Sequence, residues 1–108
     1  MKSYIRNARI SPRKMQVIAA IVRNMDVKQA LDTLQFMPQK GALILYKGLH
    51  SATANAEHND MQERTNLVIE SLVVSKGVVY KRFNPVSRGR AHPIKKRTSN
   101  VSISLSVK

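Results

Sequence analysis

The chain has 108 residues and a formal net charge of +13, from 19 lysines and arginines against six acids. That length suffices for one domain, residues 1–108, but not for a cofactor domain beside a substrate domain. The absence of cysteine excludes a disulfide scaffold, a thiolate zinc site and a cysteine nucleophile. The apolar run at 17–22 is too short to span a bilayer, and the first ten residues lack the apolar segment of a signal peptide. We therefore expect a small soluble intracellular protein whose partner is a polyanion, with no membrane or small-molecule partner.

The positive charge is concentrated at the two ends of the chain. Residues 1–25 hold six cations and no acid, residues 26–70 hold four cations and all six acids, and residues 71–108 hold nine cations and no acid. A surface selected only for solubility would intersperse both signs. The middle of the chain is therefore predicted to be a scaffold, and the two ends its contact surfaces.

Two helices are predicted in the first third of the chain. Ser11 and Pro12 suit the N-cap and first position of a helix, and apolar residues then recur at spacings of three and four. Two cations, Arg13 and Lys14, fall in its first turn, where the helix dipole disfavours them, which suggests that their charge is used elsewhere. Asn24 is expected to end this helix in a left-handed conformation. A second helix is predicted from an N-cap at Asp26 to Pro38.

A third, longer helix is predicted from Pro38 to about Asn59. Gly41 and Gly48 each cost such a helix about 1 kcal/mol relative to alanine, so close packing must compensate for them. Small residues dominate its second half and permit the close approach of another element. Both Phe36 and Tyr46 are expected in the core.

The periodicity changes to that of strands after residue 65. Residues 67–69 and 72–74 are rich in β-branched side chains, and residues 101–107, VSISLSV, alternate strictly between apolar and polar. Residues 3–10 can supply a third strand. Helices followed by paired strands predict an α+β domain with an antiparallel sheet packed on the helices.

Between the two late strands lies a basic segment, residues 76–97, with eight cations and too few apolar residues for a core. Because it connects strands that should pair, we interpret it as a long hairpin arm with its tip near residues 85–92. About eleven residues per limb, at about 3.3 Å each, would reach roughly 35 Å from the domain. A two-stranded ribbon of this composition is marginal in water, so we expect a partner to order it.

Little in the sequence indicates catalysis, and no metal site is expected. His50 and His58 are eight residues apart, or roughly 12 Å along a helix, which is too far for one metal ion. The run at 57–60, EHND, coincides with the predicted helix end and is interpreted as capping and surface. A basic ribonuclease using His58 or His92 stays open as the enzyme alternative.

The composition favours recognition of nucleic-acid shape and backbone. Lysine and arginine supply a sequence-independent attraction to phosphate, and only five aromatic residues are present to stack on bases. In the arm, Tyr80 and Phe83 can either stack on a base or pack across the hairpin. These features do not separate folded RNA from DNA, and a DNA-bending architectural protein with a β-ribbon arm is the alternative.

Several blocks resemble one family. Residues 51–59, SATANAEHN, closely resemble the third-helix signature of the ribosomal protein L-twenty-two family of the large subunit. Residues 89–91 (GRA) and 96–100 (KRTSN), with the strand at 101–107, resemble its C-terminal signature. Residues 11–14 (SPRK) and 29–31 (QAL) resemble its first and second helices. The resemblance covers essentially the whole chain, although Val86 stands where the family pattern has arginine or histidine.

This resemblance implies three helices packed on a small three-stranded antiparallel sheet with a long protruding β-hairpin. It further implies a cytoplasmic, ribosome-bound structural protein without a cofactor, from a bacterial or organelle-encoded ribosome. Its partners would be large-subunit ribosomal RNA, neighbouring ribosomal proteins and the nascent polypeptide, since in the family the hairpin lines the polypeptide exit tunnel and supports assembly.

Two sets of residues follow from the charge pattern and the resemblance together. The expected RNA-binding residues are Arg6, Arg9, Arg13, Lys14, Lys76, Lys81, Arg82, Arg88, Gly89, Arg90, Lys95, Lys96, Arg97 and Thr98. The expected tunnel-lining tip is Pro85, Val86, Ser87, Arg88, Gly89, Arg90, Ala91 and His92.

Overall fold

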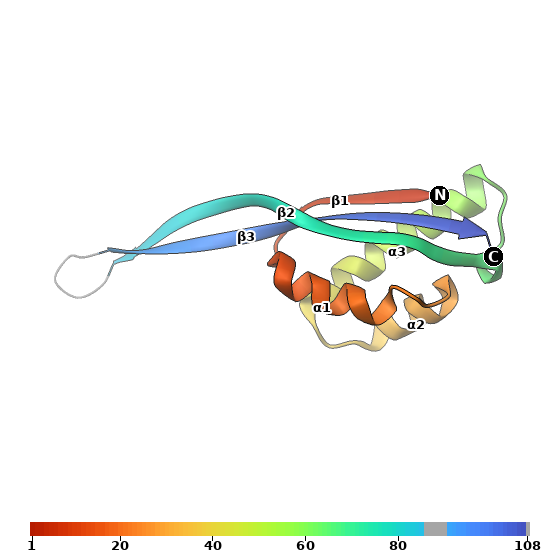
Figure 1. Ribbon diagram of the computed structural model, residues 1–108, viewed down its shortest axis with the longest axis horizontal. Coiled ribbons are helices and arrows are strands. Elements are labelled where there is room, and N and C mark those ends of the chain that lie inside the picture. The colour runs from red at the N-terminus through yellow and green to blue at the C-terminus, as the bar shows by residue number, and fades with distance from the viewer. Residues whose placement is uncertain (86–90, 108) are drawn as a thin grey trace.

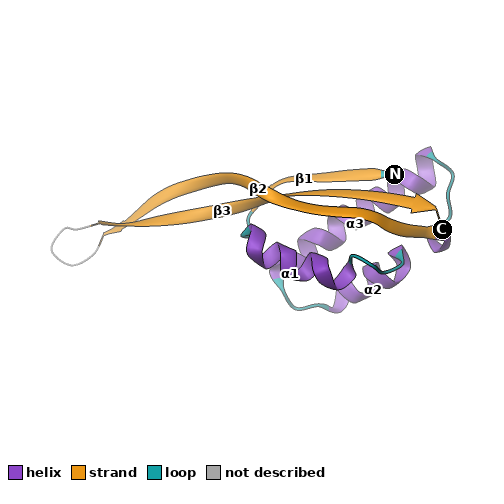
Figure 2. Ribbon diagram, in the orientation of Figure 1, coloured by secondary structure: helices purple, strands orange, loops and turns teal. Residues whose placement is uncertain are grey.

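The computed structural model describes residues 1–85 and 91–107, with the backbone alone for 81–85 and 91–95. Three helices lie beside a sheet from which two strands extend far beyond the rest of the molecule (Figures 1 and 2). In chain order the elements are β1 (Lys2–Ala8), α1 (Pro12–Val22), α2 (Val27–Phe36), α3 (Lys40–Asn59), a 3-10 turn (Arg64–Asn66), β2 (Leu67–Pro85) and β3 (Ala91–Val107).

The sheet has the strand order β1-β3-β2, and both pairings are antiparallel. The alternation predicted for the last strand is confirmed at its centre, because Val101, Ile103 and Leu105 are buried while Ser102 is exposed. The helices therefore cover one face of the sheet, and the other face is left open. This is the predicted α+β fold.

Close packing compensates for the helical glycines, as expected. Gly48 is buried in α3, and a Cβ placed on it would collide with the side chain of Ile5 in β1 and come 3.2 Å from Cδ1 of Ile103 in β3. The glycine thus lets the helix backbone approach the two strands above it. Buried small residues continue this contact face along α3, at Ala52, Thr53 and Ala56.

The arm is a continuation of the same two strands that build the sheet. The pairing of β1 with β3 ends at Ala8 and Ser99, and Ser99 pairs on its other side with Lys76. From there β2 and β3 pair alone as far as Pro85 and Ala91. The molecule is consequently 62 Å long against 24 and 17 Å in the other directions (Figure 1). The predicted hairpin is confirmed over the described residues.

Three local predictions in the helices are wrong. Pro38 does not enter the first turn of α3, because Met37 before it is extended (ψ 132°), as a residue preceding proline prefers, and Gln39 is the N-cap. Asn24 is not left-handed, since Asn7 and Met61 are the non-glycine residues with positive φ in the described chain. Phe36 is 83% exposed, because it lies two positions beyond Leu34 and so falls off the buried stripe of α2.

The other aromatic residue predicted for the core, Tyr46, is partly buried and packs against the hydrophobic core from α3. Its ring centroid is 6.0 Å from that of His50, one turn further along the helix.

Candidate nucleic-acid interface

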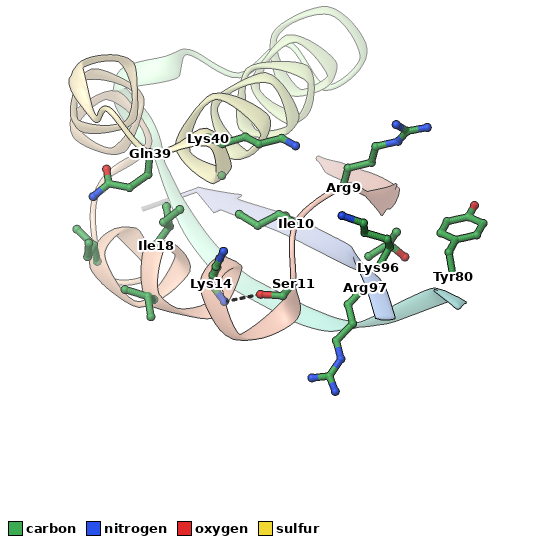
Figure 3. A pocket seen from close by; sticks show the side chains of 14 residues that line it. Arg9, Ile10, Ser11, Lys14, Ile18, Gln39, Lys40, Tyr80, Lys96 and Arg97 are labelled. Carbon is green, nitrogen blue, oxygen red and sulfur yellow. Dashed lines mark hydrogen bonds between the residues drawn. The ribbon is translucent and has the colours of Figure 1, made fainter. Parts of the chain in front are cut away.

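A pocket of about 1120 Å³ lies between α1, the start of α3 and the base of the arm (Figure 3). Its floor is apolar and its rim is polar and basic. The residues that line it are Arg9, Ile10, Ser11, Lys14, Val17, Ile18, Ile21, Gln39, Lys40, Gly41, Tyr80, Lys96, Arg97 and Thr98.

The floor of the pocket is fixed by the turn between β1 and α1. The backbone N–H of Ile10 donates to the carbonyl of Ala8 at 2.7 Å, and the buried hydroxyl of Ser99 donates to the carbonyl of Ile10 at 2.6 Å. A Cβ on Gly41 would lie 2.5 Å from Cδ1 of Ile18 and 2.6 Å from Cδ1 of Ile10, so the start of α3 rests directly on this floor. The pocket is therefore shaped by packed elements.

One wall begins at the N-terminus of α1. Ser11 is its N-cap, and the backbone N–H of Lys14 donates to the Ser11 hydroxyl at 3.4 Å, with Pro12 in the first turn as predicted. This capping orients the first turn so that Lys14 faces the pocket.

All the charged side chains that line the pocket are positive. The side chains of Lys14, Lys40 and Lys96, from three different elements, extend toward its middle around Ile10, whereas Arg97 extends away from that point (Figure 3). No acid is among the lining residues. The salt bridges Met1–Asp60 and Arg64–Glu57 both lie outside it. A concave surface with converging cations and no carboxylate attracts an anion.

A hydrogen-bonded junction holds the base of the arm. In it the backbone N–H of Asn7, at φ 52°, donates to Oδ1 of Asn100 at 2.9 Å, and Oδ1 of Asn7 accepts from the N–H of Val78 at 3.3 Å. The Thr98 hydroxyl donates to the Val78 carbonyl at 2.7 Å. A Cβ on Gly77 would lie 2.9 Å from Oδ1 of Asn7, so glycine is needed where these strands meet.

The structure brings five of the predicted RNA-binding residues together, since Arg9, Lys14, Lys96, Arg97 and Thr98 all line the pocket. Three others are exposed but lie outside it: Arg6, Arg13 and Lys76. The guanidinium carbon of Arg6 is 5.3 Å from the ring centroid of Tyr4, which is a cation–π contact.

Thr98 has a structural role at the base of the arm. It is only 3% exposed, and its hydroxyl is bound to the Val78 carbonyl within the junction. Its hydroxyl therefore helps to hold the two limbs of the arm together, and its expected contact with RNA stays a prediction.

The rest of the predicted set lies in the arm. The backbone register pairs Lys81 with Lys95, Arg82 with Ile94, Asn84 with His92 and Pro85 with Ala91. The remaining predicted residues lie outside the described ones: Val86, Ser87, Arg88, Gly89 and Arg90.

Sequence reasoning missed Lys40 and the apolar surface beside it. Lys40 is the first residue of α3, and the signal that singled out Arg13 and Lys14, a cation where the helix dipole disfavours it, also marks this lysine. Because residues 26–70 are nearly neutral overall, the charge pattern alone does not single out Lys40. The exposed apolar residues of α1, Val17 and Ile21, belong to the pocket only through the tertiary arrangement.

The two acids of the run at 57–60 have structural partners. Glu57 binds Nε of Arg64 through Oε1 at 3.1 Å, and Asp60 pairs with the amino group of Met1 at 3.3 Å. Among the described residues, no three histidines, aspartates or glutamates are close enough to hold a metal ion. No helix in the described part of the chain is long and apolar enough to cross a membrane.

The fold and the pocket together define a small basic α+β protein with a hairpin arm and a concave basic surface that no acid lines. The model of the family described as ribosomal protein L22p/L17e matches residues 3–106. A curated relative, large ribosomal subunit protein uL22 of Syntrophotalea carbinolica, is 43% identical over 107 residues, which cover 99% of this chain and 97% of the relative. The protein of the same name from Desulfotalea psychrophila is 45% identical over 97 residues, covering 90% and 88% of the two chains. The chain belongs to the ribosomal protein L22p/L17e family, which confirms the resemblance of its sequence blocks.

Proposed function

We propose that this protein is a structural constituent of the large ribosomal subunit that binds large-subunit ribosomal RNA. The observation that carries the proposal is the convergence of Lys14, Lys40 and Lys96 on a pocket with no acid, in a chain of a ribosomal protein family. Phosphate contacts by such lysines release counterions, which gives an affinity that does not depend on sequence. Folded RNA supplies phosphates from several directions at one point, as a concave surface requires.

The arm extends this interface away from the domain. Six of its eight cations lie on the described parts of β2 and β3, and beyond Lys76 and Ser99 these two strands pair without a third strand in the described chain. In agreement with the family resemblance, we propose that the arm runs along the wall of the polypeptide exit tunnel, between ribosomal RNA and the nascent chain. There the RNA supplies the order that an isolated two-stranded ribbon lacks. Neighbouring ribosomal proteins are its further partners. By contacting separate segments of the RNA, the protein supports assembly of the subunit. Its location is the ribosome in the cytoplasm.

No feature of the described structure favours either alternative, the DNA-bending protein or the ribonuclease. A DNA-bending role fits the charge and the ribbon, but the family match favours RNA. For a nuclease, His58 lies exposed near the end of α3, and the side chain of His92 is outside the described ones, so the described side chains do not bring the two histidines together. We propose no catalytic step.

The proposal is tested by measuring how RNA affinity depends on salt in two lysine variants of α3. Lys40 lines the pocket, whereas Lys47 is equally a lysine, exposed and helical but lies outside it. With a large-subunit RNA transcript, Lys40→Ala should reduce the slope of log K against log salt by about one unit, the share of one phosphate contact. Lys47→Ala should leave the slope unchanged. Equal slopes for both variants, or no binding by the wild-type chain, would contradict the proposal.

A further inference from the structure

The floor of the basic pocket is apolar, which phosphate binding alone does not require. Ile10 and Ile18 form its buried base, at 9% and 4% exposure. Beside them Val17 and Ile21, one turn apart on α1, are 62% and 46% exposed. These two side chains are not scattered surface residues, since both line the same concavity. A concave apolar surface is typical of a ligand site.

The rim restricts what can cover this floor. Three ammonium groups extend into the pocket and no lining residue is acidic, so an apolar protein segment laid over the floor would trap unpaired charges. An occupant that is flat and apolar on one side and anionic on the other satisfies both surfaces. A nucleotide has this chemistry, with a base that buries its face and a phosphate that binds lysine.

We propose that the pocket receives one unpaired nucleotide of the RNA, with its base on the floor formed by Ile10, Val17, Ile18 and Ile21 and its phosphates bound by the three lysines. This inference rests on the RNA binding proposed above. The volume of about 1120 Å³ exceeds the roughly 300–1,000 Å³ of small-ligand sites, so it accommodates the base together with flanking phosphates.

The inference also assigns a class of RNA structure to the site. Bases within a duplex are stacked and present only their edges, whereas a bulge or loop can splay a base outward to be buried by a protein. Tyr80, 42% exposed at the arm side of the pocket, adds an aromatic wall. The pocket therefore fits a bulged or looped nucleotide beside a phosphate-rich turn.

Salt dependence separates this base contact from the phosphate contacts. The double variant Val17→Ala, Ile21→Ala removes apolar surface but no charge, so its affinity for a large-subunit RNA transcript should fall at least about tenfold with an unchanged salt slope. The matched control is Phe36→Ala, Leu43→Ala, which also truncates two exposed apolar helix residues but outside the pocket. The control should bind as the wild type does. Because all four residues are exposed, thermal melting should show every variant folded.

A second readout locates the base directly. In full-length protein with labelled isoleucine methyl groups, an RNA hairpin carrying one bulged nucleotide should shift the methyl resonances of Ile10, Ile18 and Ile21 through the ring current of the base. The same hairpin without the bulge should leave them unshifted, and Ile69, which pairs with Leu105 in the sheet and does not line the pocket, should not respond to either RNA. Equal shifts from both hairpins, or none from the bulged one, would overturn the proposal.

The outcomes keep the two proposals apart. If the wild-type chain does not bind large-subunit RNA, the proposed function fails. If it binds and the double variant binds equally well, RNA binding stands and the nucleotide pocket is wrong, in which case the floor belongs to a protein segment or to nothing.

Discussion

Asn7 is the residue on which the junction between the sheet and the arm most depends. It has a left-handed backbone (φ 52°), its N–H is bound by Asn100, and its side-chain oxygen accepts from the backbone of Val78 and, at 3.5 Å, from the hydroxyl of Thr98. Two substitutions separate these contributions. Asn7→Gly removes the side-chain acceptor but tolerates the backbone, whereas Asn7→Ala removes the acceptor and also strains the backbone.

The expected magnitudes follow from the geometry. The hydrogen bond from the Val78 N–H to Oδ1 is long, at 3.3 Å, and exposed, and the single proton of the Thr98 hydroxyl is directed mainly to the Val78 carbonyl, so the side-chain acceptor contributes only about 0.5–1 kcal/mol. A left-handed alanine costs a further 1–2 kcal/mol or so, because Cβ approaches the following carbonyl. We therefore expect Asn7→Ala to lower the free energy of unfolding by about 1.5–3 kcal/mol, and Asn7→Gly by about 1–2 kcal/mol less.

Urea denaturation of the full chain followed by circular dichroism measures both changes, and hydrogen exchange at the Val78 amide reports on the junction itself. Both variants should speed exchange at that amide, because its acceptor is gone. A glycine variant as unstable as the alanine variant would refute the role of the backbone conformation. Unchanged exchange at Val78 in both variants would refute the role of the side chain.

Further predictions concern the arm and the corrected core. Residues Lys81 and Lys95 are register partners, and like charges at directly opposed positions destabilise a strand pair by roughly 0.2–1 kcal/mol. Lys81→Glu should therefore slow amide exchange in the free arm while weakening binding to large-subunit RNA in a filter assay; tighter binding would contradict a phosphate-facing arm. Phe36→Ser should change the unfolding free energy by less than about 0.5 kcal/mol, because Phe36 is exposed. In contrast, Leu105→Ala should lower the free energy of unfolding by about 2–5 kcal/mol in a urea titration, because Leu105 is buried. A larger loss for Phe36→Ser than for Leu105→Ala would contradict the burial described for α2 and β3.

Features encoded in local periodicity were predictable from the sequence. The serine–apolar alternation of residues 101–107 defined the strand and its buried face, and the Ser11-Pro12 pair located the start of α1. The hairpin followed from a basic segment connecting two strands that had to pair. Each of these signals depends on neighbours in the chain, so no tertiary information was needed.

The features that the sequence did not predict depend on tertiary packing, except for Phe36, whose helical spacing from Leu34 already indicated exposure. Phe36 was assigned to the core by its hydrophobicity, although its position relative to Leu34 takes it off the buried stripe. Thr98 belongs to a basic block, yet it is buried because it bonds across the hairpin to Val78. The pocket itself could not be predicted, since Lys14, Lys40 and Lys96 converge only when three separate elements pack together.

The central claim, that this surface is built for folded large-subunit RNA, is tested most directly by competition. Full-length protein bound to a labelled large-subunit RNA transcript at physiological salt is challenged with unlabelled transcript or with duplex DNA at equal phosphate concentration. We predict that the transcript displaces the label well before DNA does, because a concave pocket and a long arm contact phosphates that only a folded RNA presents together. Displacement by DNA at the same or a lower concentration would contradict this account.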